Sequence, residues 1–191
     1  MPATSVADRA SAVLVVIDLQ ERLTAAMPAR ASVLSAADKL VRIAALTGLP
    51  VIVTRQYPAG LGDIEPRLRT ALDTAAARVS VTTTDKTAFN CFSDAAFVER
   101  LDGTGRRQLI IAGMESHICV VQTALAGLRA GLDVHVVADA CCSRDDGSHE
   151  IALARMRQAG AVVTSTESVL YELVGVAGTD EFRALLKVVK E

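Results

Sequence analysis

Short apolar runs alternate with longer amphipathic stretches along the whole chain. Six runs rich in β-branched residues predict strands at residues 13–17, 50–54, 79–84, 108–112, 133–138 and 161–164. Between them, apolar residues recur at helical spacing over residues 32–47, 116–130, 147–159 and about 180–190. Strands that are apolar throughout and separated by helices favour an α/β fold with a parallel sheet covered on both faces.

The longest stretch without such a pattern is residues 55–78, RQYPAGLGDIEPRLRTALDTAAAR. Its Pro and Gly residues predict a loop after the second strand, where an open α/β protein places substrate contacts. No repeat or linker divides the 191 residues, so we expect a single domain over residues 1–191.

Composition narrows the classes of partner. Twenty basic residues face twenty-two acidic ones, and a formal net charge of −2 offers no field for nucleic acid or an anionic membrane. No apolar run approaches the roughly 20 residues that cross a bilayer, and the start of the chain does not resemble a signal peptide. The four cysteines, Cys91, Cys119, Cys141 and Cys142, form no CxxC pair and have no zinc-site spacing. We therefore expect free thiols, a cytoplasmic location, and neither metal nor cofactor.

Three reactive side chains fall at the ends of predicted strands. Asp18 ends the first strand, Lys86 follows the third, and Cys119 lies just after the fourth. Ligands of open parallel sheets bind outside the carboxyl ends of the strands, where the strand order reverses. In a doubly wound sheet the first and fourth strands are neighbours at that point, so Asp18 and Cys119 can meet.

Cys119 is the candidate nucleophile. With Ser116 as the N-cap, it lies in the first turn of a helix, where the helix dipole and Lys86 lower the pKa of a thiol. An ionised Asp18 opposes this effect, so we expect Asp18 and Cys119 to share one proton. Asp18 then serves as general acid and base, and the backbone N–H groups of Glu115 and Cys119 hold an oxyanion.

Each of these residues also has a plain structural interpretation. A cysteine is often a small buried hydrophobe, and an aspartate at a strand end is often a turn residue. Substrate contacts are predicted more weakly, since a helix cap or loop packing explains three of the candidates equally well, and core packing is favoured for Phe89. These weaker candidates are Gln20, Gln56, Tyr57 and Phe89.

Several segments resemble the isochorismatase-like cysteine hydrolases, and within them the isochorismatase domain-containing protein 2 branch. The matching segments are VLVVIDLQERL, VIVTRQYPAGLG, DKTAFNCF, AGMESHICVVQTALAGLRAGLDVHVVADACCSR and ALARMRQAGAVVTSTESVLYEL, in family order over residues 13–173. The resemblance implies a three-layer α/β/α fold with a six-stranded parallel sheet. It also implies a catalytic triad at Asp18, Lys86 and Cys119, and a cis peptide bond between Met114 and Glu115.

Two departures from the family limit what the resemblance implies. Metal-binding nicotinamidases carry Asp-x-His after the second strand, whereas this chain has TRQYPAG there, so we predict no metal. Isochorismatases of this fold lack the cysteine and cleave a vinyl ether, so the family name says little about the substrate.

The leading prediction is a metal-independent hydrolase that cleaves a small amide or related C–N bond through a Cys119 thioester. A nucleotide-binding oxidoreductase is disfavoured, because DLQERL after the first strand has no G-x-G-x-x-G. A non-catalytic interaction protein and a redox-active thiol protein stay open. The apolar residues of ESVLYELVGVAG, late in the chain, predict a homodimer or larger assembly.

Overall fold

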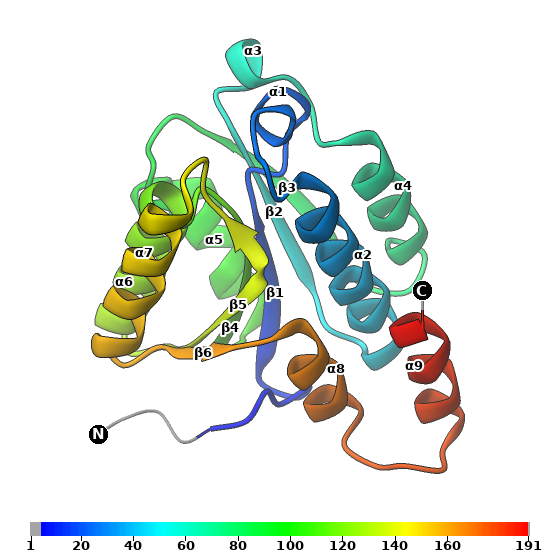
Figure 1. Ribbon diagram of the computed structural model, residues 1–191. Coiled ribbons are helices and arrows are strands. Elements are labelled where there is room, and N and C mark those ends of the chain that lie inside the picture. The colour runs from blue at the N-terminus through cyan, green and yellow to red at the C-terminus, as the bar shows by residue number, and fades with distance from the viewer. Residues whose placement is uncertain (1–4, 191) are drawn as a thin grey trace.

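The computed structural model describes residues 5–190, which form a sheet of six strands between two layers of helices (Figure 1). The strands are β1 (Ala12–Ile17), β2 (Val51–Gln56), β3 (Val81–Lys86), β4 (Gln108–Met114), β5 (Asp133–Cys142) and β6 (Val162–Thr164). Their order across the sheet is β3-β2-β1-β4-β5-β6, and every neighbouring pair is parallel. The strand order reverses between β1 and β4, as predicted for a doubly wound sheet.

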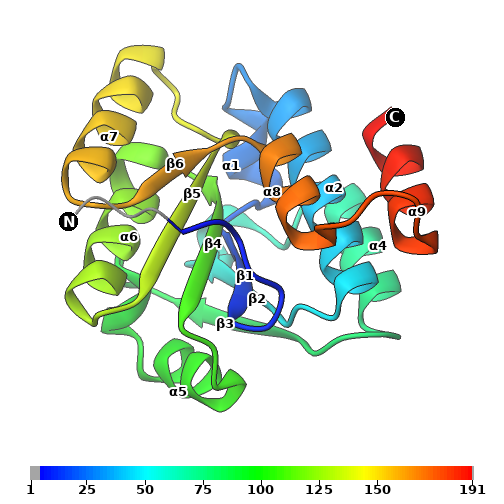
Figure 2. The same ribbon diagram turned by 90° about the horizontal axis from the view of Figure 1, so that it is seen from below.

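Helices cover both faces of the sheet. One layer contains α2 (Arg30–Thr47), α4 (Pro66–Ala75), α8 (Thr166–Val174) and α9 (Asp180–Lys190). The other contains α5 (Ala95–Thr104), α6 (Val121–Arg129) and α7 (Asp146–Gln158). The short helices α1 (Glu21–Ala25) and α3 (Pro58–Leu61) lie beyond the carboxyl end of the sheet. Figure 2 shows the sheet from its other end, between the two layers.

Alternation along the central strands explains the three layers. Leu14 and Val16 of β1 pack into the core under α2, whereas Val13, Val15 and Ile17 pack into the core under α6. Because both faces of β1 are covered, the strand is apolar at every position and fully buried. The predicted α/β fold with its six-stranded parallel sheet is confirmed.

The prediction of a loop over residues 55–78 is wrong for its second half, where α4 forms. Pro66 starts the helix, and the Glu65 carboxylate accepts hydrogen bonds from the N–H groups of Arg67 and Leu68. Leu68 and Leu72, four residues apart, bury one face of the helix in the core. The start signal was therefore present in the sequence, as a capping acid followed by proline.

The apolar segment at residues 167–178 does not form the exposed patch that predicted an oligomer. Most of its apolar side chains belong to α8 and are buried in the protein's own core, as Val169, Leu170 and Leu173 show. Tyr171 and Val176 are the large apolar side chains of this segment that reach the surface. The amphipathic spacing thus indicated a core helix.

None of the helices within residues 5–190 has both the length and the hydropathy that a membrane span requires.

Candidate active site

The carboxyl ends of three strands bring the predicted triad together. Asp18 directly follows β1, Lys86 is the last residue of β3, and Cys119 lies in the turn after β4. The chains of β1 and β4 approach closely just before this point. Gly113 has φ +137°, and a Cβ there would stand 2.1 Å from the carbonyl oxygen of Ile17. Only glycine allows this approach, which places the two turns that follow side by side.

Lys86 connects the other two members of the triad. Its Nζ donates to Asp18 Oδ2 at 2.7 Å and lies 3.7 Å from Cys119 Sγ. Both charged side chains have 0% exposure. A buried ion pair is stable only when its remaining donors and acceptors find partners.

Further hydrogen bonds supply those partners. Thr54 Oγ1 donates to Asp18 Oδ1 at 2.7 Å, and Lys86 Nζ donates to Gln56 Oε1 at 2.6 Å and to the Ala88 carbonyl at 3.3 Å. Thr54 and Gln56 are alternate residues of β2, the strand between β1 and β3, and both are buried. Their hydrogen bonds orient the Asp18 carboxylate and the Lys86 ammonium group toward each other.

Gln20 and Gln56, both predicted as weak substrate contacts, hydrogen-bond other groups of the protein. Gln20 is fully buried, and its amide donates to the carbonyls of Gln56 (3.1 Å) and Gly62 (2.8 Å) and accepts from the Gln56 N–H (2.7 Å). Gln20 is the residue before α1, but its side chain does not cap that helix. It fastens both ends of the loop over residues 56–62.

Cys119 lies in a single π-helical turn, Ser116–Val120, that leads into α6. The predicted helix over residues 116–130 therefore begins differently from the expectation, and Ser116 is not its N-cap. Glu115 precedes the turn, and the Ser116 hydroxyl hydrogen-bonds His149 Nδ1 at 2.8 Å instead. The peptide bond between Met114 and Glu115 is cis.

The expectation that the pKa of Cys119 is lowered is wrong. Burial raises the pKa of this thiol well above its usual range, and the Asp18 carboxylate, which hydrogen-bonds the thiol, raises it further, while Lys86 acts in the opposite direction. Burial also acts to lower the pKa of Lys86, but the Asp18 carboxylate outweighs it and raises the pKa above its ordinary value. In the resting protein the site therefore holds a charged Lys86 and a neutral Cys119 thiol.

Tyr57 and Phe89 are exposed, with 57% and 53% of their surfaces accessible. Tyr57 has φ 38°, and a Cβ on Gly60 would overlap its ring at 2.5 Å, so the ring lies against the loop main chain. Both aromatic residues neighbour triad supports in sequence, at Gln56 and Ala88. Their contact with a substrate stays a prediction.

Thr54 and Cys91 were missed as neighbours of the triad. The Cys91 thiol is fully buried, interacts electrostatically with Lys86 and hydrogen-bonds Thr54 and Thr123. Thr54 could have been found, because alternation along the second strand places it on the same face as Gln56. Cys91 carries no such signal, since it lies in a short turn after the strand.

Among residues 5–190, no group of three or more His, Cys, Asp or Glu side chains is arranged to hold a metal ion. The positive charge beside the Cys119 thiol comes from Lys86.

Comparisons with known proteins place the chain in a family. Residues 12–168 match the model named Isochorismatase domain. The chain is 35% identical over 182 residues to isochorismatase domain-containing protein 2A of Mus musculus, a match that covers 95% of this chain and 84% of the relative.

Solved structures extend the likeness to the fold. The MAR1 ribonuclease of Caenorhabditis elegans is 30% identical with a TM-score of 0.88, and the match covers 98% of this chain and 93% of that one. The YcaC gene product of Escherichia coli, described as an octameric hydrolase of unknown specificity, is 26% identical with a TM-score of 0.86 over 98% of this chain and 92% of that one. These neighbours agree with the three-layer architecture described above.

Proposed function

The chain belongs to the isochorismatase domain family, and from this membership and the site geometry we propose that it is a single-domain cysteine hydrolase. Its substrate is a small amide or a related compound with a C–N bond, and no metal takes part. One observation carries the proposal: Lys86 Nζ lies within hydrogen-bond range of both Asp18 Oδ2 (2.7 Å) and Cys119 Sγ (3.7 Å) in a buried site. A nucleophile, a proton carrier and a cation are thus held together.

The first half of the reaction makes a thioester. Cys119 Sγ attacks the carbonyl carbon of the substrate while its proton passes to Asp18, so the thiolate forms only as it reacts. The tetrahedral intermediate collapses, the C–N bond breaks, and Asp18 donates the proton to the leaving nitrogen. The raised pKa of the Cys119 thiol fits this sequence, because a neutral resting thiol requires a base beside it.

The second half releases the acid. Water attacks the thioester carbonyl as Asp18 accepts one of its protons, and the C–S bond breaks. The proton then returns to Cys119, which restores the starting state. Lys86 stays protonated throughout and offsets the negative charge that passes between Asp18 and Cys119.

Backbone N–H groups of Glu115 and Cys119 are the proposed oxyanion donors. Glu115 directly precedes the turn that presents the thiol, Cys119 lies within that turn, and both residues are buried. Removing one such donor typically costs about 3 kcal/mol of barrier.

A panel of small amides, ureides and carbamates tests the proposal by ammonia release. We expect turnover of at least one class by the wild type and none by Cys119→Ala. Full activity of Cys119→Ala on a true substrate would contradict the thioester mechanism.

Two other functions are less well supported. The name of the C. elegans neighbour includes ribonuclease, but this chain has a net charge of −2, and arginines next to the site are paired with carboxylates. Arg55 bonds Asp63 and Asp85, and Arg144 bonds Glu115. A purely redox or binding role would not require the buried Lys86–Asp18 pair.

We also propose a homo-oligomer, now on the ground that the similar YcaC protein is octameric. Light scattering at micromolar concentration should give a multiple of 20.1 kDa. A mass near that of one chain would contradict it.

A cytoplasmic location is consistent with four unpaired cysteines.

Absence of a catalytic metal is tested by chelation. Activity should survive prolonged dialysis against a chelator, and elemental analysis should find no stoichiometric zinc or iron. Loss of activity that only added metal restores would contradict this part of the proposal.

A further inference from the structure

Three successive residues at the start of the turn that carries Cys119 form hydrogen bonds with residues that do not belong to the triad. Glu115, Ser116 and His117 each bond a residue in the segment that leads from β5 into α7, between Ser143 and His149. The mechanism above uses none of these side-chain contacts. They join the turn of the nucleophile to a neighbouring part of the chain.

Glu115 makes the strongest of the three contacts. Its Oε2 accepts from the main-chain N–H of Arg144 at 2.9 Å and from Arg144 Nε at 3.1 Å, and its Oε1 accepts from Nη2 at 2.7 Å. The Glu115 side chain has 4% exposure, whereas that of Arg144 has 65%. A buried carboxylate needs such a partner to stay charged.

The pKa of Glu115 agrees with this pairing. Burial acts to raise the pKa of this carboxyl, but the hydrogen bonds and charge of Arg144 outweigh it and bring the pKa below its ordinary value. The carboxylate is therefore charged at neutral pH and held by a planar, two-pronged contact.

The main chain of Glu115 is held as well. Its carbonyl accepts from the N–H groups of Ile118 (3.0 Å) and Val120 (3.2 Å), on either side of Cys119. Its N–H is one of the proposed oxyanion donors. A rigid path thus runs from the Arg144 guanidinium through the Glu115 carboxylate to that N–H.

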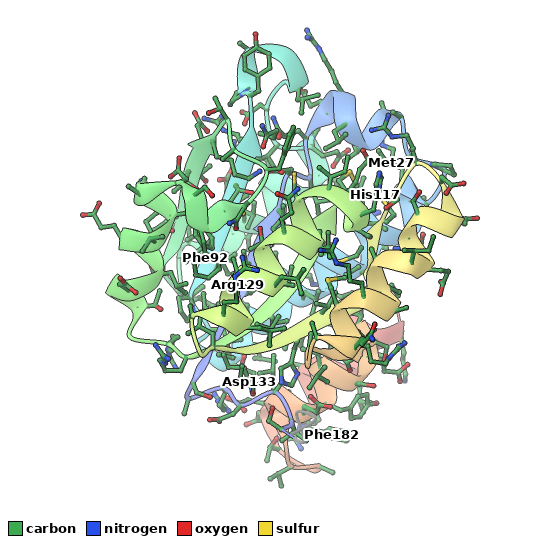
Figure 3. The ribbon with its side chains drawn as sticks, turned by 90° about the vertical axis from the view of Figure 1, so that its left-hand side faces the viewer. Met27, Phe92, His117, Arg129, Asp133 and Phe182 are labelled. Atoms are coloured by element: carbon green, nitrogen blue, oxygen red, sulfur yellow. The ribbon has the colours of Figure 1, made fainter. Side chains whose placement is uncertain are left out.

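Two neighbouring contacts hold the same turn. Ser116 Oγ lies 2.8 Å from His149 Nδ1, and His117 Nδ1 lies 2.9 Å from Ser143 Oγ. Figure 3 shows His117 near the ends at which α6 and α7 begin. Every residue from 115 to 117 is therefore held by the segment from Ser143 to His149, which leads into α7.

We propose that Arg144 is a positioning residue that acts through Glu115 to fix the oxyanion-binding N–H beside Cys119. This inference rests on the proposed function, since it assigns a role within the same reaction. A lysine offers no planar fork, so Lys at position 144 should substitute only in part.

The test compares two reactions of Cys119 that differ in one respect. Acylation by p-nitrophenyl acetate passes through an oxyanion, whereas alkylation by iodoacetamide does not. Arg144→Ala should slow acylation about 10- to 100-fold and change alkylation about twofold at most. Arg144→Lys should fall between, and added guanidinium should partly restore acylation by Arg144→Ala.

A matched control is available at the surface. Arg9 binds Glu181 through two hydrogen bonds, of 2.8 Å and 3.1 Å, far along the chain from the turn. Arg9→Ala should leave both rates unchanged. Thermal unfolding of each variant reports whether the fold is intact.

A double-mutant cycle separates positioning from direct substrate contact. Glu115→Gln should slow acylation like Arg144→Ala, and Arg144→Ala should add little in that background. Equal slowing of acylation and alkylation, an undiminished Arg144→Ala effect in the Glu115→Gln background, or no effect at all would overturn the role. Failure of the proposed function has a different signature, because the wild type would then acylate no faster than Cys119→Ala.

Discussion

At the carboxyl edge of the sheet, buried polar side chains join an acid, a cation and a thiol, whereas at the amino edge polar side chains bond the main chain of residues 6–8 as well as one another. At the first edge, Lys86, Asp18 and Thr54 are joined in one chain of hydrogen bonds beside the Cys119 thiol. At the second, Gln108 accepts the N–H of Asp8 at 2.7 Å and donates to the carbonyl of Val6 at 3.0 Å. The two clusters lie at opposite ends of the same strands.

The amino edge even contains the residue types of a hydrolase. Asp133 Oδ2 lies 3.4 Å from His135 Nε2, and the Ser5 hydroxyl bonds both residues. However, the serine and the aspartate both contact Nε2, so His135 cannot pass a proton from one to the other through its two ring nitrogens. In Figure 3, Asp133 and His117 mark the two ends. Both clusters contain buried polar groups. The groups to which they bond distinguish a cluster arranged for catalysis from one that holds the chain in place.

The largest expected effect is loss of turnover at the carboxyl edge. Cys119→Ala removes the nucleophile without leaving a charge unpaired, so kcat should fall about 1,000-fold or more with little loss of stability. Asp18→Asn and Lys86→Ala should abolish turnover too, but each leaves a buried charge without its partner, which costs about 3–5 kcal/mol. Steady-state kinetics and urea unfolding of the same preparations measure the two effects. Double mutants should be little worse than Cys119→Ala, because the three residues act as a unit.

The matched substitution at the amino edge should affect stability and leave turnover intact. Gln108→Ala removes the donor and acceptor that hold Val6 and Asp8 and leaves two part-buried main-chain groups without this partner. We expect the free energy of unfolding to fall by about 1–3 kcal/mol while kcat and KM stay within a factor of two. Urea titration measures the first quantity. A large loss of kcat in a folded variant would mean that the two edges are coupled.

The sequence predicted those parts of the site whose positions follow from where the strands end. Asp18, Lys86 and Cys119 each lie at or just after the end of a predicted strand, and parallel strands end at one edge, so their meeting follows from the topology. The position of Gln56 is a different case. Gln56 pairs with Lys86 across the neighbouring strands β2 and β3, but nothing in its local sequence shows that its amide oxygen would accept a hydrogen bond from Lys86 Nζ.

The sequence pattern did not show that the Cys119 thiol is buried. The prediction of a lowered pKa for Cys119 was based on two effects, the dipole at the start of the helix and the charge of Lys86. The opposing effect comes from packing of distant segments around the thiol, which no short pattern reports. The role of Gln20 depends likewise on contacts with a segment far away in sequence.

Alkaline pH should lower the free energy of unfolding through the buried Cys91 thiol, which lies near the carboxyl ends of the strands. Burial raises the pKa of Cys91 to about 11 from an ordinary value of 9.0. Below pH 9 this thiol is neutral in both folded and unfolded chains, so its contribution to stability is fully present. Between pH 9 and 11 only the unfolded chain ionises, and the contribution is lost at about 1.4 kcal/mol per pH unit. Urea unfolding at pH 8.5, 9.5 and 10.5 should show a shallower decline for Cys91→Ala than for the wild type, and equal slopes would contradict the assignment.

The smallest expected effect is a difference in alkylation rate among the four thiols. All are buried, and Cys119, at 5% exposure, is marginally more accessible than Cys141 and Cys142 at 3% and Cys91 at 0%. Asp18 provides Cys119 alone with a hydrogen-bonded base at its thiol, and Lys86 lies 3.7 Å away, so the thiolate can form transiently there despite the raised pKa. We expect iodoacetamide at pH 7.5 to modify Cys119 about three- to tenfold faster than the other three, yet more slowly than a free cysteine. Lys86→Met should slow the reaction, because no cation then favours the thiolate. Mass mapping of the first alkylated cysteine measures this order, and modification of Cys142 ahead of Cys119 would show that accessibility outweighs the base in determining which thiol reacts.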